Sequence, residues 1–239
     1  MANQEIIFYD LPNKGTNKAW SLNTWKTRFA LNYKGIPYKT EWIEYPDIKP
    51  TFQDHVPKAD QYTVPTIILP DGTWVTDSAK IAEVLESRYP EKKLFLDSQY
   101  VPKVASVFPE IFGAAGVNYL PLIFKRIISP GSEAHFRTTR EAAVGMTLEE
   151  FSKLGGEGVW KKAAPGLEKV TALLKENPEG PFFEGSNVTY ADFIWAGFLI
   201  MTQRIGEDIL GEFLKHTGDG DVHLKLLEAV KPWAERDDH

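Results

Sequence analysis

Segments with strand-like patterns occur only in the first 95 or so of the 239 residues of this chain. In that part, short runs of β-branched and aromatic residues alternate with segments whose apolar residues recur at helical spacing. The patterns predict strands at 5–9, 38–44, 66–69 and 73–76, and helices at 21–34, 47–56 and 78–88. Strands and helices in this order predict a small α/β sheet covered by helices.

From about residue 100 onward only helical patterns remain. They predict helices at 101–125, 133–154, 159–176, 189–206, 207–216 and 221–235, with breaks rich in Gly and Pro at 129–131, 177–178 and 218–220. The stretch after Tyr89 reads as a linker, because Pro90 ends the preceding helix. We therefore expect two domains, an α/β domain at 1–95 and an all-α domain at 96–239.

The distribution of charged and apolar residues excludes two classes of function. The net charge is −6 and the basic residues are dispersed, whereas nucleic-acid binding needs a concentrated basic surface. No run of about 18 apolar residues is present, so no membrane span is predicted, and the shorter run Phe193 to Met201 reads as a buried helix. Met1 leads into a strand without the preamble of a signal peptide, so we expect a cytoplasmic protein.

Ser21 lies at the junction between the first predicted strand and the first predicted helix. Its hydroxyl is therefore expected near the positive end of a helix dipole, beside backbone N–H groups that have no partner within the helix. Two interpretations follow from this position. Ser21 either caps the helix, or it helps to hold an anionic ligand such as a thiolate.

Two later dipeptides stand at similar junctions. Val64-Pro65 precedes the strand predicted at 66–69, and Asp77-Ser78 opens the helix predicted at 78–88. Taken alone, Pro65 is typical of a strand start, where it removes no ladder hydrogen bond, and Asp77-Ser78 is typical of a helix cap. The combination with Ser21, rather than either dipeptide, points to a function.

In this order and at these distances, Ser21, Val64-Pro65 and Asp77-Ser78 resemble the glutathione-binding domain of glutathione transferases. The stretch from Ser21 to Gly35 is similar to the serine-type members of that family. Leu22 departs from the pattern, because those members commonly have Pro there, and the change affects the loop that aims the Ser21 hydroxyl.

Two further stretches resemble one branch of the family, the bacterial lignin β-etherases and the related fungal class A transferases. These are Trp25-Lys26-Thr27-Arg28 and the segment Phe136 to Glu141, which is followed by Gly145 and by Thr147 to Glu149. The resemblance covers most of the chain and is densest in the first 90 residues. It implies a thioredoxin-like N-terminal domain followed by an all-helical domain, with glutathione as co-substrate and a homodimeric assembly.

The resemblance also implies a role for each motif. Ser21 would donate a hydrogen bond to the glutathione thiolate, and a cis Pro65 would turn the backbone of Val64 toward the cysteinyl unit, which pairs with it like an added strand. Ser78 and nearby N–H groups would receive the γ-glutamyl carboxylate, while Asp77 faces the ammonium group. Many members have Glu at the position of Asp77. The Asp77 side chain is shorter, so it reaches less far toward the ammonium group.

The chain contains no cysteine, so the reactive sulfur has to arrive with a ligand. Disulfides, thiolate metal ligands, a Cys nucleophile and a CxxC redox pair are all excluded, and no metal site is predicted. Lowering a thiol pKa from about 8.5 by about two units needs roughly 2.7 kcal/mol. One hydrogen bond to an anion supplies on the order of 1.5–3 kcal/mol and a helix end roughly 0.3–1. A hydroxyl at a helix start is therefore enough, without a general base.

The sequence context of Ser21 argues against a serine hydrolase as an alternative. The GxSxG turn of such enzymes is absent around Ser21, and none of the five histidines lies in a recognisable catalytic context. Thr189 and Asp192 have capping-box spacing before the apolar run Phe193 to Met201, and we interpret them as structural.

The acceptor pocket is the least defined part of the prediction. A helix broken by Pro109 and Pro121 would line an apolar cleft for a flat aromatic ligand, with Asn23 and Tyr119 as its polar groups. Arg137, Arg140 and Glu141 are expected to form surface pairs at helical spacing.

Two classes of function remain open at this point. The chain is either an enzyme that uses activated glutathione for conjugation, peroxide reduction or aryl ether cleavage, or a binding protein of the same fold that carries aromatic or polyphenolic compounds. Ser21 favours the enzyme, whereas Leu22 and the aromatic segment from Phe108 to Phe124 give weight to the carrier.

Overall fold

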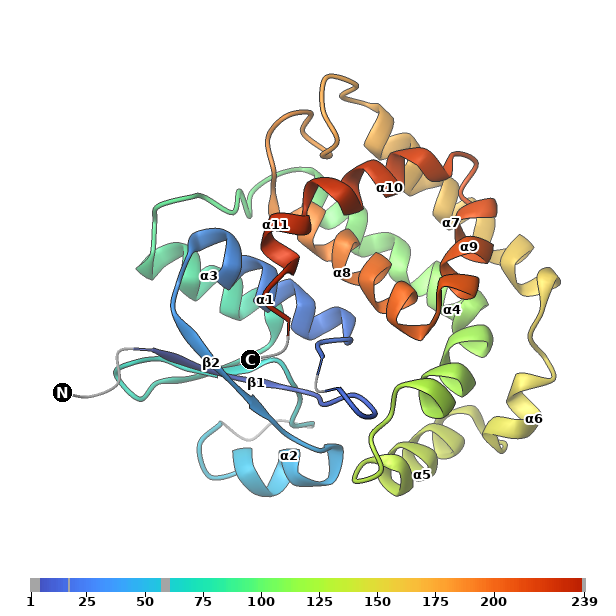
Figure 1. Ribbon diagram of the computed structural model, residues 1–239, viewed down its shortest axis with the longest axis horizontal. Helices are drawn as coiled ribbons and strands as arrows, with labels where there is room; N and C mark the ends of the chain where they lie inside the picture. The colour runs from blue at the N-terminus through green and yellow to red at the C-terminus, as the bar shows by residue number, and fades with distance from the viewer. Residues whose placement is uncertain (1–4, 17, 57–60, 238–239) are drawn as a thin grey trace.

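The computed structural model describes residues 5–16, 18–56 and 61–237. Its sheet has the strand order β2-β1-β3-β4. The central strand β1 (Ile6–Asp10) runs parallel to β2 (Tyr38–Trp42) and antiparallel to β3 (Thr66–Ile68), which pairs with β4 (Trp74–Thr76). Helices α1 (Leu22–Lys34) and α3 (Ser78–Arg88) lie on one face, and α2 (Tyr45–Phe52) lies on the other (Figure 1). The predicted thioredoxin-like half is confirmed.

The rest of the described chain is helical, as predicted. The helices are α4 (Tyr100–Arg126), α5 (Glu133–Val144), α6 (Leu148–Ser152), α7 (Glu157–Lys175), α8 (Tyr190–Ile205), α9 (Glu207–Lys215), α10 (Gly220–Ala229) and α11 (Lys231–Ala234). The apolar helix α8 is buried almost throughout and packs against α1 and α4, so it joins the two halves through the core. The short α11 returns to α1 (Figure 1).

Three of the predicted helices differ from those in the structure. The segment at 133–154 forms two helices, because Gly145 adopts a left-handed φ of 74° that ends α5. The segment at 221–235 is likewise divided, at Val230. The expectation that Pro109 and Pro121 break their helix was wrong, since α4 is continuous. Each proline removes one backbone donor without ending the helix, and α4 packs along both α7 and α8.

Helix α4 is also long and apolar enough to cross a membrane, judged by length and composition alone. It contains no single long apolar run, because its polar residues are spread along the helix. In the fold, α4 packs against α7 and α8 as part of the helical half.

Arg28 holds α1 against the sheet from inside. The side chains of Arg28 and Asp10 are both fully buried, and their Nη2 and Oδ2 atoms lie 2.9 Å apart. The guanidinium lies 5.0 Å from the ring centre of Phe8 and also donates to the backbone oxygen of Arg236, near the C-terminus. Breaking such a pair leaves a buried charge, so this part of the Trp25 to Arg28 stretch serves the fold.

The predicted capping box at the start of α8 is confirmed. Asp192 accepts hydrogen bonds from the backbone of Thr189 at 2.7 Å and of Phe183 at 2.9 Å. Burial raises the pKa of Asp192 to about 7, although these donors favour the anion. The box fixes the start of α8, and with it the position of the following residue, Tyr190, beside α3.

Candidate active site

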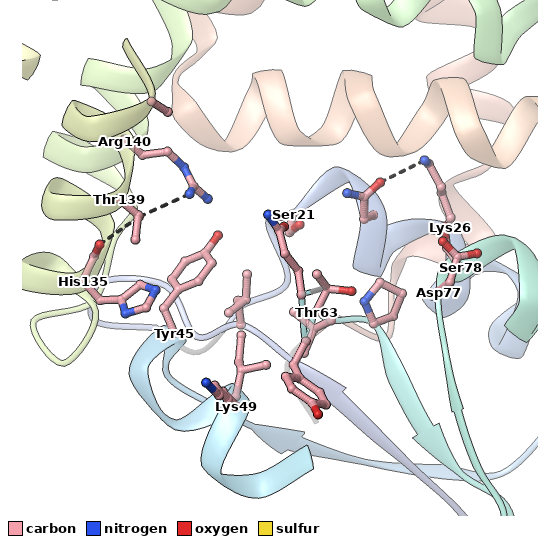
Figure 2. Close-up of a pocket in the computed structure, with 18 of the residues that line it drawn as sticks. Ser21, Lys26, Tyr45, Lys49, Thr63, Asp77, Ser78, His135, Thr139 and Arg140 are labelled. Atoms are coloured by element: carbon pink, nitrogen blue, oxygen red, sulfur yellow. Dashed lines mark hydrogen bonds between the residues drawn. The ribbon is translucent and has the colours of Figure 1, made fainter. Parts of the chain in front are cut away.

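A cavity of about 850 Å³ lies between the sheet half and α5. Its lining comes from the starts of α1 and α3, from α2, from the loop before β3, and from one face of α5. Figure 2 shows Ser21 in the middle of this cavity, between two walls. The α3 wall consists of Lys26, Val64, Pro65, Asp77 and Ser78, and the α5 wall of Tyr45, His135, Thr139 and Arg140.

The hydroxyl of Ser21 makes no capping hydrogen bond with α1. The backbone is extended at this residue (φ −73°, ψ 130°), and only its carbonyl joins the helix, accepting from the amide of Trp25 at 3.0 Å and from the hydroxyl of Thr24 at 3.1 Å. The interpretation of the Ser21 side chain as a helix cap was therefore wrong. Among the described residues the hydroxyl has no partner, so it is available to donate to a ligand in the cavity.

The predicted cis peptide bond between Val64 and Pro65 is confirmed. Val64 lines the cavity, and its backbone amide and carbonyl have no backbone partner within the described ranges 5–16, 18–56 and 61–237. The carbonyl of Pro65 accepts from the amide of Asp77 at 3.3 Å. The loop before β3 and the start of α3 are thus joined next to the cavity, and the Val64 backbone is available to a ligand.

Asp77 is the N-cap of α3 and also lines the cavity. Its Oδ1 accepts from the amides of Ala79 at 2.9 Å and Lys80 at 3.1 Å. Its φ of 82° is rare for a residue with a side chain and is typical of constrained sites. Ser78 is held through its carbonyl, which accepts from the hydroxyl of Tyr190 at 2.9 Å. The helical half therefore fixes the N-terminal end of α3.

Lys26 belongs to the α3 wall and was not predicted as a site residue. Its Nζ donates to the side-chain oxygen of Asn23 at 2.9 Å, and it lies 5.8 Å from the ring centre of Phe108 on α4. Burial lowers the pKa of Lys26, and the charge of Asp77 partly opposes the shift. The sequence carried a signal for it, since Lys26 lies three residues after Asn23, a spacing that makes two side chains neighbours on a helix.

The two residues predicted for the acceptor pocket lie in different places. Asn23 lines the cavity beside Lys26. Tyr119 does not line it, and that prediction was wrong: the side chain is 1% exposed, and its hydroxyl lies 3.3 Å from the hydroxyl of Thr202 on α8. Burial raises the pKa of Tyr119. Tyr119 faces the core because α8 covers that side of α4.

The predicted surface position of Arg140 was also wrong. We expected it in a surface pair, but within the described ranges Arg137 forms the ion pairs on this helix, with Glu141 at 2.7 Å and Glu149 at 2.8 Å, and Arg140 forms none. Arg140 instead faces the cavity, with its guanidinium 4.9 Å from the ring centre of Phe136 and 5.7 Å from that of Tyr45 (Figure 2). Burial raises the pKa of Tyr45 to about 12, and Arg140 opposes the shift. Tyr45 is therefore a neutral hydrogen-bond donor at physiological pH.

Comparison with protein families assigns both halves of the chain. Residues 20–88 match the model for the N-terminal domain of glutathione S-transferases, and residues 106–233 match one for the C-terminal domain.

Individual relatives agree with these matches. The glutathione S-transferase-like protein ustS of Aspergillus flavus is 32% identical over 96% of this chain and 89% of its own length. A glutathione S-transferase of Ceriporiopsis subvermispora, solved in complex with glutathione, is 34% identical with a TM-score of 0.84, covering 96% of this chain and 97% of its own. Glutathione transferase GSTFuA2 from Phanerochaete chrysosporium is 31% identical with a TM-score of 0.84, covering 99% and 100%.

Proposed function

This chain belongs to the glutathione S-transferase family, and we propose that it activates glutathione through the hydroxyl of Ser21 for reaction with an aromatic electrophile. The observation that carries the proposal is the unpartnered hydroxyl at the start of α1, in a cavity that also presents Val64 and the start of α3. A solved relative that contains glutathione supports the choice of co-substrate.

The α3 wall matches the chemistry of the tripeptide. The γ-glutamyl carboxylate binds at the hydroxyl and amide of Ser78, since Asp77 Oδ1 already caps the next two amides of α3. The Oδ2 of Asp77 and the ammonium of Lys26 lie on either side of the amino acid group. The Val64 backbone pairs with the cysteinyl unit. Lys49, exposed at the edge of the cavity, is suited to the glycyl carboxylate. This distribution of charge favours an anionic ligand although the chain as a whole carries −6.

Ser21 acts as a hydrogen-bond donor in this mechanism. The thiol proton leaves to solvent, and the Ser21 hydroxyl together with the helix end stabilises the thiolate that remains. The sulfur electron pair then forms a bond to the electrophilic carbon or oxygen. The leaving group departs with the electrons of the bond that breaks. Conjugation, hydroperoxide reduction and aryl ether cleavage share the activated thiolate, so Ser21 serves each of them.

Titration of the bound thiol tests the mechanism directly. The ultraviolet absorbance of the thiolate should report a pKa about two units below that of free glutathione in the complex, and a value close to the free one in Ser21→Ala. Ser78→Ala is the matched control, since it should weaken glutathione binding without moving the thiol pKa. An unshifted thiol in the unaltered protein would contradict the enzyme and favour the carrier of aromatic compounds.

The proposal extends to the branch of the family, the oligomeric state and the cellular compartment of this protein. The segments Trp25 to Arg28 and Phe136 to Glu141 support an etherase-related branch, and a panel of model aryl ethers, hydroperoxides and a chlorinated nitroarene would identify the reaction. We further propose a homodimer in the cytoplasm. Analytical ultracentrifugation tests the assembly, and a monomer over the whole concentration range would refute it.

A further inference from the structure

The α5 wall holds a cation whose charge the fold does not neutralise. Arg140 has no carboxylate within 4.0 Å among the residues that the structure describes. Its polar side-chain partners are two neutral hydroxyls, that of Thr139 at 3.3 Å and that of Tyr45. Arg137 lies one turn earlier on the same helix and contacts both Glu141 at 2.7 Å and Glu149 at 2.8 Å. The outward arginine is paired, whereas the one that faces the cavity is not.

Arg140 is half-buried and held in place by aromatic rings. Its guanidinium lies against Phe136 and Tyr45, and the His135 ring stacks on Tyr45 with a centroid distance of 6.0 Å and an angle of 8°. Figure 2 shows the Tyr45 hydroxyl and the Arg140 guanidinium directed toward the same space. Both groups are donors, because Tyr45 keeps its proton at neutral pH. Two convergent donors, one of them charged, form a site for an anionic oxygen.

Apolar side chains complete this part of the cavity. Leu11 follows β1, Ile48 lies on α2 and Ala143 on α5, and all three line the same cavity. Leu11 and Ile48 are buried hydrophobic residues. A ligand here therefore meets apolar surface from three elements and a charged donor pair at one end. That combination fits an aromatic ring that carries an acidic substituent.

We propose that Arg140, together with Tyr45, binds a carboxylate or phenolate oxygen on the acceptor and selects acidic aromatic acceptors over neutral ones. The inference rests on the function proposed above, in which the α3 wall holds glutathione with its sulfur at Ser21. Ser21 itself lies between the two walls (Figure 2). An acceptor anchored at Arg140 has its ring directed toward the thiolate. For a chloronitrobenzoate, the sulfur electron pair forms the bond to the ring carbon, and chloride leaves with the electrons of the carbon–chlorine bond.

The competing assignment is that Arg140 binds a carboxylate of glutathione itself. Three probes separate the assignments by calorimetry on the full chain: S-methylglutathione, the glutathione conjugate of chloronitrobenzoate, and the methyl ester of that conjugate. All three carry the tripeptide, and only the second adds a negative charge at the acceptor end. We expect the unaltered protein to bind the acid conjugate about tenfold more tightly than its ester.

Two variants of Arg140 and one of its neighbour complete the test. Arg140→Met should abolish the preference for the acid and leave the affinity for S-methylglutathione within about twofold, while Arg140→Lys retains part of the preference. Arg137→Met is the matched control on the outer face of α5 and should behave like the unaltered protein. Circular dichroism checks that each variant is folded.

Each other outcome overturns the inference. Equal affinity of the unaltered protein for the acid conjugate and its ester would show that the protein does not recognise a charge at the acceptor end. A loss in Arg140→Met that is the same for S-methylglutathione and both conjugates assigns Arg140 to glutathione. Failure of the unaltered protein to bind S-methylglutathione refutes the proposed function as well, so the two failures are distinguishable.

Discussion

The two walls of the cavity are built by different means. The α3 wall is formed largely by the backbone at the start of α3 and by the Val64 backbone, and Ser21 lies between it and the α5 wall. The α5 wall consists of side chains from the faces of α2 and α5, with Arg140, Tyr45 and His135 held by ring contacts. The α3 wall suits a ligand whose structure is always the same. The α5 wall suits ligands that differ from one family member to another, because its side chains can be substituted without altering the fold.

The largest effect is expected from Ser21→Ala. If the hydroxyl supplies most of the two-unit shift of the thiol pKa, turnover near pH 6.5 should fall by about fiftyfold to a hundredfold. The deficit should shrink as the pH approaches the pKa of free glutathione, since the thiolate then forms without help. A pH–rate profile of kcat/KM measures both effects.

Asn23→Ala is the control for Ser21→Ala, because Asn23 lines the cavity without reaching the sulfur in the proposed mechanism. A deficit in Ser21→Ala that is the same at every pH would point to lost geometry rather than to lost thiolate. In that case the backbone ends of the α3 wall, and not the serine hydroxyl, would carry the activation.

The sequence predicted the α3 wall better than the α5 wall. Ser21, Val64-Pro65 and Asp77-Ser78 stand at the ends of strands and helices, which local patterns place to within a few residues. Tyr119 and Arg140 lie within helices, and their surroundings depend on how α8 and α5 dock. The sequence pattern was the same for Arg137 and Arg140, yet one faces Glu149 and the other faces the cavity. Helical spacing alone does not identify the buried face.

A second test removes the contact that ties the α3 wall to the helical half. Tyr190→Phe removes the 2.9 Å hydrogen bond to the half-buried Ser78 carbonyl, which costs about 0.5–1.5 kcal/mol. We expect lower stability in urea unfolding together with a KM for glutathione that rises about threefold to tenfold. Loss of stability without a change in KM would show that α3 holds its position independently.

Tyr119→Phe is the matched control for Tyr190→Phe. It also removes a buried hydroxyl, whose contact with Thr202 is longer at 3.3 Å and lies away from the cavity. The variant should lose at most about 1 kcal/mol of stability and keep its KM for glutathione.

Lys26 tests the charge of the α3 wall. Burial lowers its pKa, so in the free protein the ammonium loses its proton at a pH below that of an exposed lysine. An anionic ligand favours the charged form, so affinity for glutathione should decrease as pH rises through the pKa of Lys26. Lys26→Met should weaken binding about fivefold at neutral pH, and Lys26→Arg should remove the alkaline decrease. Calorimetry with S-methylglutathione checks this without interference from the thiol, and an unchanged alkaline limb in Lys26→Arg would assign that limb to another group.

The smallest effect is expected on the outer face of α5, and it decides whether the wall depends on side chains alone. Arg137 bridges Glu141 and Glu149 at the surface, and these partners raise its pKa. Exposed pairs of this kind contribute little and are screened by salt. Arg137→Met should therefore lower Tm by only about 1–2 °C at low ionic strength, with the difference disappearing in high salt. Its kcat/KM for acidic and neutral acceptors should equal that of the unaltered protein, because Arg140 keeps its place against Phe136 and Tyr45. If Arg137→Met instead changes the ratio between the two acceptors, the surface network positions α5, and the α5 wall depends on the backbone as much as the α3 wall does.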